Sequence, residues 1–265
     1  MKRVRRRRVG VLAGFVTATA AILVVAGSAP AVTVLAGNLL IKVDGATSPK
    51  ALPKGKFSPI SFHGSASVAT RDGSHIPPAL GTQLLVDKHI AIDTTGLPTC
   101  TLAQIQSSPP AAAMKACGDA LIGKGISTAQ VQFPEQAPFT AKGPLLAFNG
   151  PSDGGYGAKA YHEQLYYVYA DVPLPTALIA IAKVSKGSGK YGYEISISIP
   201  KIAGGAGSFS GAEFTIDRKW TYKGKKHSFL SAECANGRFD AQVKVAFGDG
   251  TNVIGNVFQA CRATG

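Results

Sequence analysis

Residues 194–200, with the sequence EISISIP, show the strictest periodicity in the chain. Ile195, Ile197 and Ile199 alternate with polar residues until Pro200 ends the run. Successive side chains of a β-strand point to opposite faces, so this alternation gives one apolar face and one polar face. The stretch therefore predicts a β-strand with one face in a hydrophobic core and the other in water.

The same alternation appears near the C-terminus, where Phe239 to Phe247 carry apolar side chains at every second position. Asp249-Gly250 predicts a tight hairpin turn, because such turns need residues that tolerate positive φ, and Asn252 to Cys261 is the expected return strand. Two further strands are expected at residues 214–216 and 230–234. Short strands separated by glycine-rich turns predict an all-β fold, an antiparallel β-sandwich or jelly-roll-like arrangement.

The N-terminus has the composition of an export signal. Six basic residues within residues 2–8 precede an uncharged stretch from Val9 to Ile41, a pattern that holds the N-terminus in the cytoplasm while the apolar part enters the membrane. Ala29-Pro30-Ala31 supplies the small residues that a signal peptidase needs, so residues 1–31 are predicted to be a signal peptide. The alternative is an uncleaved anchor, because a bilayer span needs about 20 apolar residues. We therefore expect a secreted or cell-surface protein, which contacts the membrane only through this segment if it is retained.

Nearly half of the excess positive charge of the chain lies in this signal. The full chain carries a net charge of +13, but residues 1–31 hold six of its 28 basic residues and no acidic ones, which leaves +7. The high charge of the full chain is therefore no indication of nucleic acid binding. The remaining basic residues are scattered except at residues 218–219 and 223–227. That cluster is interpreted either as a charged hairpin tip or as an attraction for an anionic cell-wall or extracellular polysaccharide.

Four cysteines predict two disulfides, Cys100 with Cys117 and Cys234 with Cys261, because an even number in an exported chain favours oxidation. Local pairing is preferred because each pair encloses a compact unit. No histidine lies at zinc-site spacing from a cysteine, so no metal and no other cofactor is expected. In a flat meander the strands ending at Cys234 and Cys261 would lie about 10 Å apart, which is too far for a disulfide. This pair therefore requires strands on facing sheets, directly paired strands, or strands that bend together.

A short helical insertion is expected between Cys100 and Cys117. Residues 101–105 form a first helical turn, and Pro109-Pro110 begins a second that ends before Gly118. Helices favour proline at their first position and glycine just after their last, and both residues occur here. The sequence predicts two short helical turns closed by a disulfide inside an otherwise β chain.

The chain beyond residue 31 is long enough for one large β domain or two small ones. Residues 32–56 contain many small, proline and lysine residues towards their end and are predicted to be a flexible leader. Residues 57–265 are predicted to be the β-sandwich domain. A division into two β subdomains near residues 150–160 is the alternative.

The candidate binding residues are aromatic and basic. Trp220 and Tyr222 lie two positions apart, so on a strand they face the same way, and Lys223, Lys225 and Lys226 follow at once. Stacking on a sugar ring with lysines at the rim is the functional interpretation, and a solvated turn is the structural one. Four tyrosines between residues 161 and 169 have the same two interpretations. They are Tyr161, Tyr166, Tyr167 and Tyr169.

Catalytic motifs are absent or incomplete in the sequence. In Gly207-Ser208-Phe209-Ser210-Gly211 a phenylalanine occupies the position of the nucleophilic serine of a nucleophile elbow. Ser188-Gly189-Lys190 lacks the hydroxyl residue and the first glycine of a phosphate loop. We therefore predict a non-catalytic binding or surface-structural protein. The alternative is a secreted hydrolase whose site is assembled from distant residues, and a deep pocket with a histidine hydrogen-bonded to a carboxylate would favour it.

Several short motifs resemble a recurrent group of exported, uncharacterised proteins of high-GC bacteria. The resemblance covers roughly residues 60–262, and it implies export and a β-rich fold without an established activity or site. The motifs are Leu97-Pro98-Thr99-Cys100, Ala116-Cys117-Gly118-Asp119-Ala120 with Gly123 and Gly125, Ala147-Phe148-Asn149-Gly150, and Cys261-Arg262.

Overall fold

A computed structural model of the chain describes residues 32–153, 161–170 and 175–265. The predicted signal peptide, residues 1–31, lies outside the described residues. So do residues 154–160, which make up most of the stretch 150–160 of the alternative division into two subdomains, and residues 171–174.

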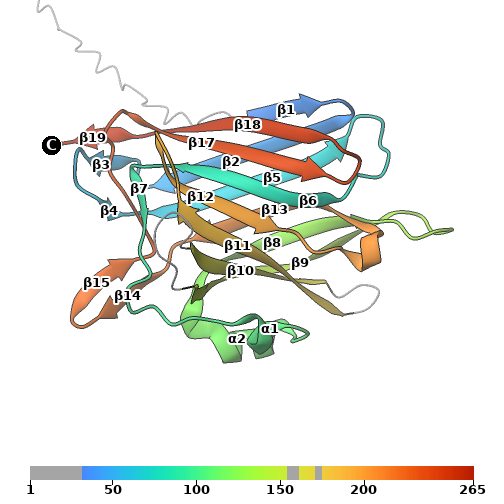
Figure 1. The fold of residues 1–265 in the computed structure, drawn as a ribbon, viewed down its shortest axis with the longest axis horizontal. Coiled ribbons are helices and arrows are strands. Elements are labelled where there is room, and N and C mark those ends of the chain that lie inside the picture. Colours follow the sequence, from blue (N-terminus) through green and yellow to red (C-terminus); the bar gives the residue numbers. More distant parts are fainter. Residues whose placement is uncertain (1–31, 154–160, 171–174) are drawn as a thin grey trace, which may run out of the picture.

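One twelve-stranded antiparallel sheet dominates the described residues (Figure 1). In spatial order its strands are β1 (Val32–Ala36), β2 (Leu39–Ser48), β5 (Ser61–Thr70), β13 (Gly207–Ile216), β8 (Leu121–Val131), β9 (Phe139–Ser152), β10 (Tyr161–Ala170), β11 (Thr176–Lys186), β12 (Tyr191–Ser198), β6 (Ala79–Asp87), β17 (Arg238–Phe247) and β18 (Asn252–Ala260).

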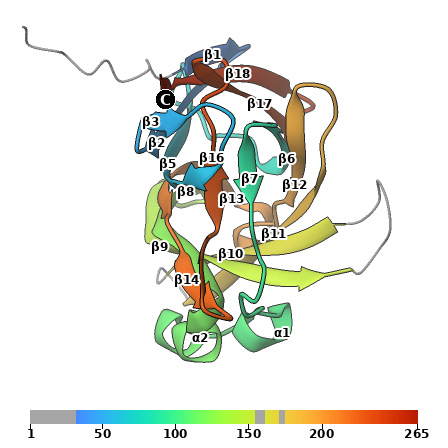
Figure 2. The same ribbon diagram turned by 90° about the vertical axis from the view of Figure 1, so that its left-hand side faces the viewer.

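This sheet curls until its first and last strands, β1 and β18, lie against each other. Gly255 lies at this seam, and a Cβ atom there would be 3.3 Å from Cγ2 of Val34. The curled sheet has two halves whose inner faces oppose each other (Figure 2). The prediction of an all-β, antiparallel fold is confirmed, and a single continuous sheet supplies both layers.

The two sequence patterns that predicted strands are confirmed in detail. Residues 194–198 belong to β12, which pairs with β11 on one side and β6 on the other. Residues 239–247 belong to β17, and a turn in which Gly250 has a φ of +87° leads into β18.

Residues 32–56 are not a flexible leader. Most of β1 and β2 pair with the next strand of the sheet in continuous register, and β2 buries Leu39 and Ile41 to exposures of 2% and 5%. The sequence prediction gave weight to the small, proline and lysine residues of the second half of this segment. It missed the strand signal of Val32 and Val34 before the turn at Gly37-Asn38 and of Leu39, Ile41 and Val43 after it, which recur at every second position.

The small elements gather at one end of the curled sheet. β4 (Ser58–Pro59), β16 (Leu230–Ala232) and β7 (Ile90–Ile92) form a three-stranded sheet across that end (Figure 2). β3 (Ala51–Pro53) pairs in parallel with β19 (Arg262–Thr264), and β14 (Lys219–Tyr222) pairs with β15 (Lys225–Ser228) as a hairpin. Leu52, Ile60, Phe229 and Leu230 fill the interior there.

The helical insertion is confirmed. It comprises α1 (Leu102–Ile105), α2 (Pro110–Cys117) and a 3₁₀ turn (Gly118–Ala120), closed by the disulfide Cys100–Cys117. Ile105 packs with Leu165 and Tyr167 on the outer face of the sheet, and the Tyr167 hydroxyl donates a hydrogen bond to the Ser108 carbonyl. Tyr167 is therefore a packing residue rather than a stacking platform.

The second disulfide, Cys234–Cys261, is also confirmed, with the two Cα atoms 5.9 Å apart. Cys234 follows β16 and Cys261 follows β18, so the cysteines come from different sheets. The disulfide therefore does not join strands of one flat meander, which agrees with the geometric argument. The strand expected at residues 230–234 is shorter than predicted and lies outside the large sheet.

The two strands that flank residues 154–160, β9 and β10, pair with each other inside the large sheet. β13 then pairs with β5 and β8 from the first half of the chain. The described residues therefore form one β unit around a common interior.

Candidate functional site

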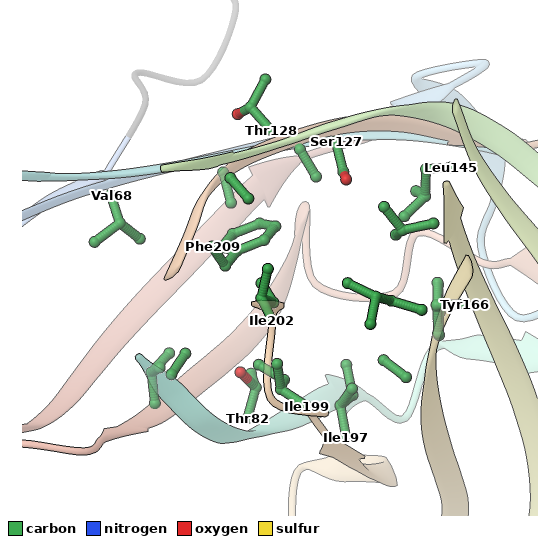
Figure 3. Close-up of a pocket in the computed structure, with 18 of the residues that line it drawn as sticks. Val68, Thr82, Ser127, Thr128, Leu145, Tyr166, Ile197, Ile199, Ile202 and Phe209 are labelled. Carbon is green, nitrogen blue, oxygen red and sulfur yellow. The ribbon is translucent and has the colours of Figure 1, made fainter. Parts of the chain in front are cut away.

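The two halves of the curled sheet enclose a cavity of about 540 Å³. Every one of the twelve strands contributes at least one residue to its wall. Figure 3 shows side chains from both halves, among them Val68, Phe209 and Ile197, that project into this space. The cavity is therefore a product of the whole sheet rather than of one loop.

The cavity wall is almost entirely apolar. Among the described lining residues only Asp44 carries a charge, and its side chain is exposed and accepts a hydrogen bond from the Gly45 amide at 2.8 Å. The hydroxyl of Thr128 donates to the Gly211 carbonyl, and the hydroxyl of Tyr166 donates to Oε1 of Gln164 at 2.7 Å. Burial raises the pKa of Tyr166 to about 12. The wall can therefore contact an uncharged, hydrophobic molecule.

Small inward-facing residues on part of the sheet help to make room for the cavity. Strands β5, β8, β9 and β13 turn several glycine and alanine residues inward among larger ones such as Leu145 and Phe209, whereas the residues that β6, β11, β12 and β17 turn inward are mostly leucine, isoleucine and valine. Small residues opposite branched ones leave space between the walls. The small residues are Gly64, Ala66, Ala129, Ala141, Gly143 and Ala212, and the branched ones include Leu84, Leu178, Ile195, Ile197, Val243 and Val245.

A glycine-rich segment crosses one end of the cavity between β12 and β13. Ile199 and Ile202 from this segment line the cavity (Figure 3). Gly204 and Gly205 have φ values of +69° and +111°, which a residue with a side chain rarely adopts. A Cβ atom on Gly207 would lie 2.4 Å from Cγ2 of Ile202, so glycine at 207 makes room for this side chain.

The hairpin β14–β15 contains all five residues singled out for binding, and the structure places them on different sides. Trp220 and Tyr222 face the body of the protein and are half-buried. Trp220 donates its Nε1 hydrogen to the Thr95 carbonyl at 3.0 Å, and its ring stacks on His227 with centroids 5.4 Å apart. The ring of Tyr222 occupies the space that a side chain on Gly96 would need. These rings anchor the hairpin to residues 93–96.

The three lysines of the hairpin face the solvent. Lys223, Lys225 and Lys226 are exposed, and none forms an ion pair within the described part of the chain. Lys223 and Gly224 have φ values of +47° and +73°, and Nζ of Lys223 lies 5.4 Å from the centroid of the Tyr222 ring. The hairpin tip therefore presents positive charge without an exposed stacking platform.

Two histidines form short contacts with carboxylates, the feature that would favour a hydrolase. Nδ1 of His227 lies 2.7 Å from Asp93, and Nδ1 of His89 lies 3.0 Å from Glu233. Burial of Asp93 opposes its ionisation, but the hydrogen bonds from His227 and Thr95 outweigh that effect and lower its pKa. Neither pair lines the cavity. The pairs join segments of the chain and lie apart from the one large apolar space described above.

The described residues contain neither a metal-binding cluster nor a membrane-spanning helix. No group of His, Cys, Asp and Glu side chains in residues 32–153, 161–170 and 175–265 could hold a metal ion. No helix in the same part of the chain is long and apolar enough to cross a membrane. Comparison of the chain with protein-family models, with curated proteins and with solved structures finds no match.

Proposed function

We propose that this protein is an exported, non-catalytic binding protein that holds a hydrophobic small molecule between the two halves of its sheet. The observation that carries the proposal is the apolar cavity of about 540 Å³. Protein interiors are normally close-packed, with few voids larger than a water molecule. A cavity of this size leaves many apolar side chains without partners, which costs stability unless a ligand supplies the missing contacts.

The size and chemistry of the cavity support this proposal. Small-molecule sites typically have volumes of about 300–1,000 Å³ and mostly apolar walls. Transfer of an alkyl chain from water into such a site contributes about 0.8 kcal/mol per CH₂ group. About ten methylene groups would thus gain about 8 kcal/mol, from which the entropy cost of binding must be subtracted.

Export is supported by the two disulfides, which indicate an oxidising, extracytoplasmic environment. The predicted signal peptide gives the route. A carrier outside the cytoplasm would shield a poorly soluble molecule from water. The hydrolase alternative has less support, because the histidine–carboxylate pairs lie outside the cavity.

The direct experiment is a titration with N-phenyl-1-naphthylamine, a neutral apolar dye whose fluorescence rises in a dry environment. We expect saturable binding at about one dye per protein, which a medium-length alkyl alcohol displaces. A linear, non-saturating signal, or the same signal from unfolded protein, would contradict the proposal.

A second candidate role rests on the hairpin tip. Lys223, Lys225 and Lys226 lie close together in an exposed turn, which favours weak, salt-sensitive attraction to an anionic cell-wall or extracellular polysaccharide. This role concerns where the protein is retained, whereas the cavity concerns what it binds.

A further inference from the structure

A second hollow of about 500 Å³ opens at the opposite end of strands β10, β11 and β12. It lies beside β7, and we call it the basic groove. Its wall includes Lys88 and Lys186, the rings of Phe57, Tyr161 and Tyr193, and His162. The basic groove is thus polar and positively charged, whereas the wall of the cavity is almost entirely apolar and includes no lysine or arginine.

The two lysines of the basic groove are available to a ligand. No carboxylate residue appears among its described lining residues, and neither Lys88 nor Lys186 forms an ion pair within the described part of the chain. An anionic group between them would therefore meet two ammonium groups and no competing negative charge from the wall.

His162 gives the basic groove an unsatisfied polar atom. Its Nε2 is buried and has no hydrogen-bond partner among the described residues. Such orphaned atoms are rare in folded proteins and call for an explanation. Burial lowers the pKa of His162, so the neutral ring is favoured, and a neutral ring can donate or accept one hydrogen bond with a ligand oxygen.

The basic groove and the cavity share one wall. Val184 lines the basic groove, and its direct register partner Ile195 lines the cavity. Along β10, His162 lines the basic groove and Tyr166 lines the cavity, and these two residues lie on the same face of the strand because they are four positions apart. Gln164 lies between them on that face, 2% exposed and bonded to the Tyr166 hydroxyl. Along β10, Gln164 and Tyr166 form the layer between the two spaces.

We propose that the natural ligand is an amphiphile, with its apolar chain in the cavity and an anionic head group, carboxylate or phosphate, at Lys88 and Lys186. This inference rests on the proposed function, because it assigns a class to the ligand of the same cavity. The layer of Gln164 and Tyr166 must shift to let the chain pass. The head group supplies His162 with the hydrogen bond that it lacks.

Binding of three ligands with the same alkyl chain tests the inference: an alcohol, a carboxylic acid and a monophosphate. We expect the two anionic ligands to bind about tenfold more tightly than the alcohol at low salt, with a preference that shrinks as salt rises. The double variant Lys88→Gln/Lys186→Gln should lose that preference and keep the alcohol affinity. The matched control is Lys124→Gln/Lys142→Gln, which removes the same charge from exposed positions that line neither space.

Each outcome decides a different point. If all three ligands bind equally to the wild type, or if the anionic preference survives in the Lys88/Lys186 double variant, the head-group assignment is wrong and the hydrophobic-ligand function stands. If the control loses the preference as well, only the net charge of the protein matters and the assignment is again wrong. If no ligand binds, the proposed function fails and the head-group assignment fails with it. Stronger binding of the acid or of the phosphate identifies the class of head group.

Discussion

The two ends of the interior show how one sheet can be packed and hollow at once. At the end near β16, a segment of the chain enters between the walls, and Phe229 and Leu230 fill the space with exposures of 1% and 9%. Further along the same strands, no segment of the described residues fills the space to the same degree, and Phe209 and Ile197 line a cavity that Ile202 only borders. The strands are continuous through both regions, so the hollow does not come from a poorly formed sheet. It comes from small side chains and from the lack, among the described residues, of a segment that fills this part of the interior.

The largest expected change in the free energy of unfolding follows from this contrast between the filled end and the hollow end. Phe229→Ala should lower the free energy of unfolding by about 3–5 kcal/mol, because it opens a void in a packed region. Phe209→Ala should cost only about 1–2 kcal/mol in the ligand-free protein, because its ring already borders empty space. Urea denaturation of both variants measures the difference. Equal losses would mean that the two regions are packed alike.

A smaller effect is expected where the hairpin β14–β15 joins the filled end. Asp93→Asn removes the charge that His227 contacts and should cost about 1 kcal/mol at neutral pH, a value kept low because Asp93 is partly exposed. The pKa of Asp93 is lower in the folded protein than in the unfolded chain, so its contribution is complete at neutral pH and is lost as the pH falls through the acidic range.

Thermal melts from pH 7 to pH 3 test this prediction. The wild type should lose more stability than Asp93→Asn on acidification, so the two curves should converge. Curves that stay parallel would show that the carboxylate of Asp93 has no role in anchoring the hairpin.

More of the fold than of the candidate site could be predicted from the sequence. Alternation at residues 194–200 and 239–247 identified strands, and the even number of cysteines with a preference for local pairs identified both disulfides, because these features are local. The leader at residues 32–56 was predicted wrongly, because its composition outweighed its alternation. The cavity was missed for a different reason. Its signal is alanine and glycine on the inner faces of β5, β8, β9 and β13, and inner faces oppose each other only once strands far apart in sequence have paired.

The binding residues of the hairpin illustrate the same limit. Sequence spacing correctly placed Trp220 and Tyr222 on one face of a strand, but it could not reveal that this face covers Thr95 and Gly96. The histidine and lysines of the basic groove come from β10, β11 and the turn after β6, and no spacing rule connects them.

The smallest expected effect on stability concerns the hairpin tip. Replacement of Lys223, Lys225 and Lys226 with Gln should change the free energy of unfolding by less than about 0.5 kcal/mol, because exposed charges contribute little. The same variant should lose salt-dependent retention on acidic polysaccharide, which sedimentation with insoluble cell-wall material measures across a salt series. Unchanged retention would show that the tip is only a solvated turn.

The central claim, that the hollow end of the interior holds a hydrophobic ligand, is tested most directly by filling it. Ala66 faces the cavity on β5, and Ala69 on the same strand is exposed to solvent, so Ala66→Phe and Ala69→Phe form a matched pair. The measurement is the dissociation constant of N-phenyl-1-naphthylamine for both variants, each first shown by circular dichroism to be folded. We predict that Ala66→Phe weakens binding at least tenfold and that Ala69→Phe binds like the wild type. Equal binding by both variants would contradict the claim, because the dye would then be bound outside the cavity.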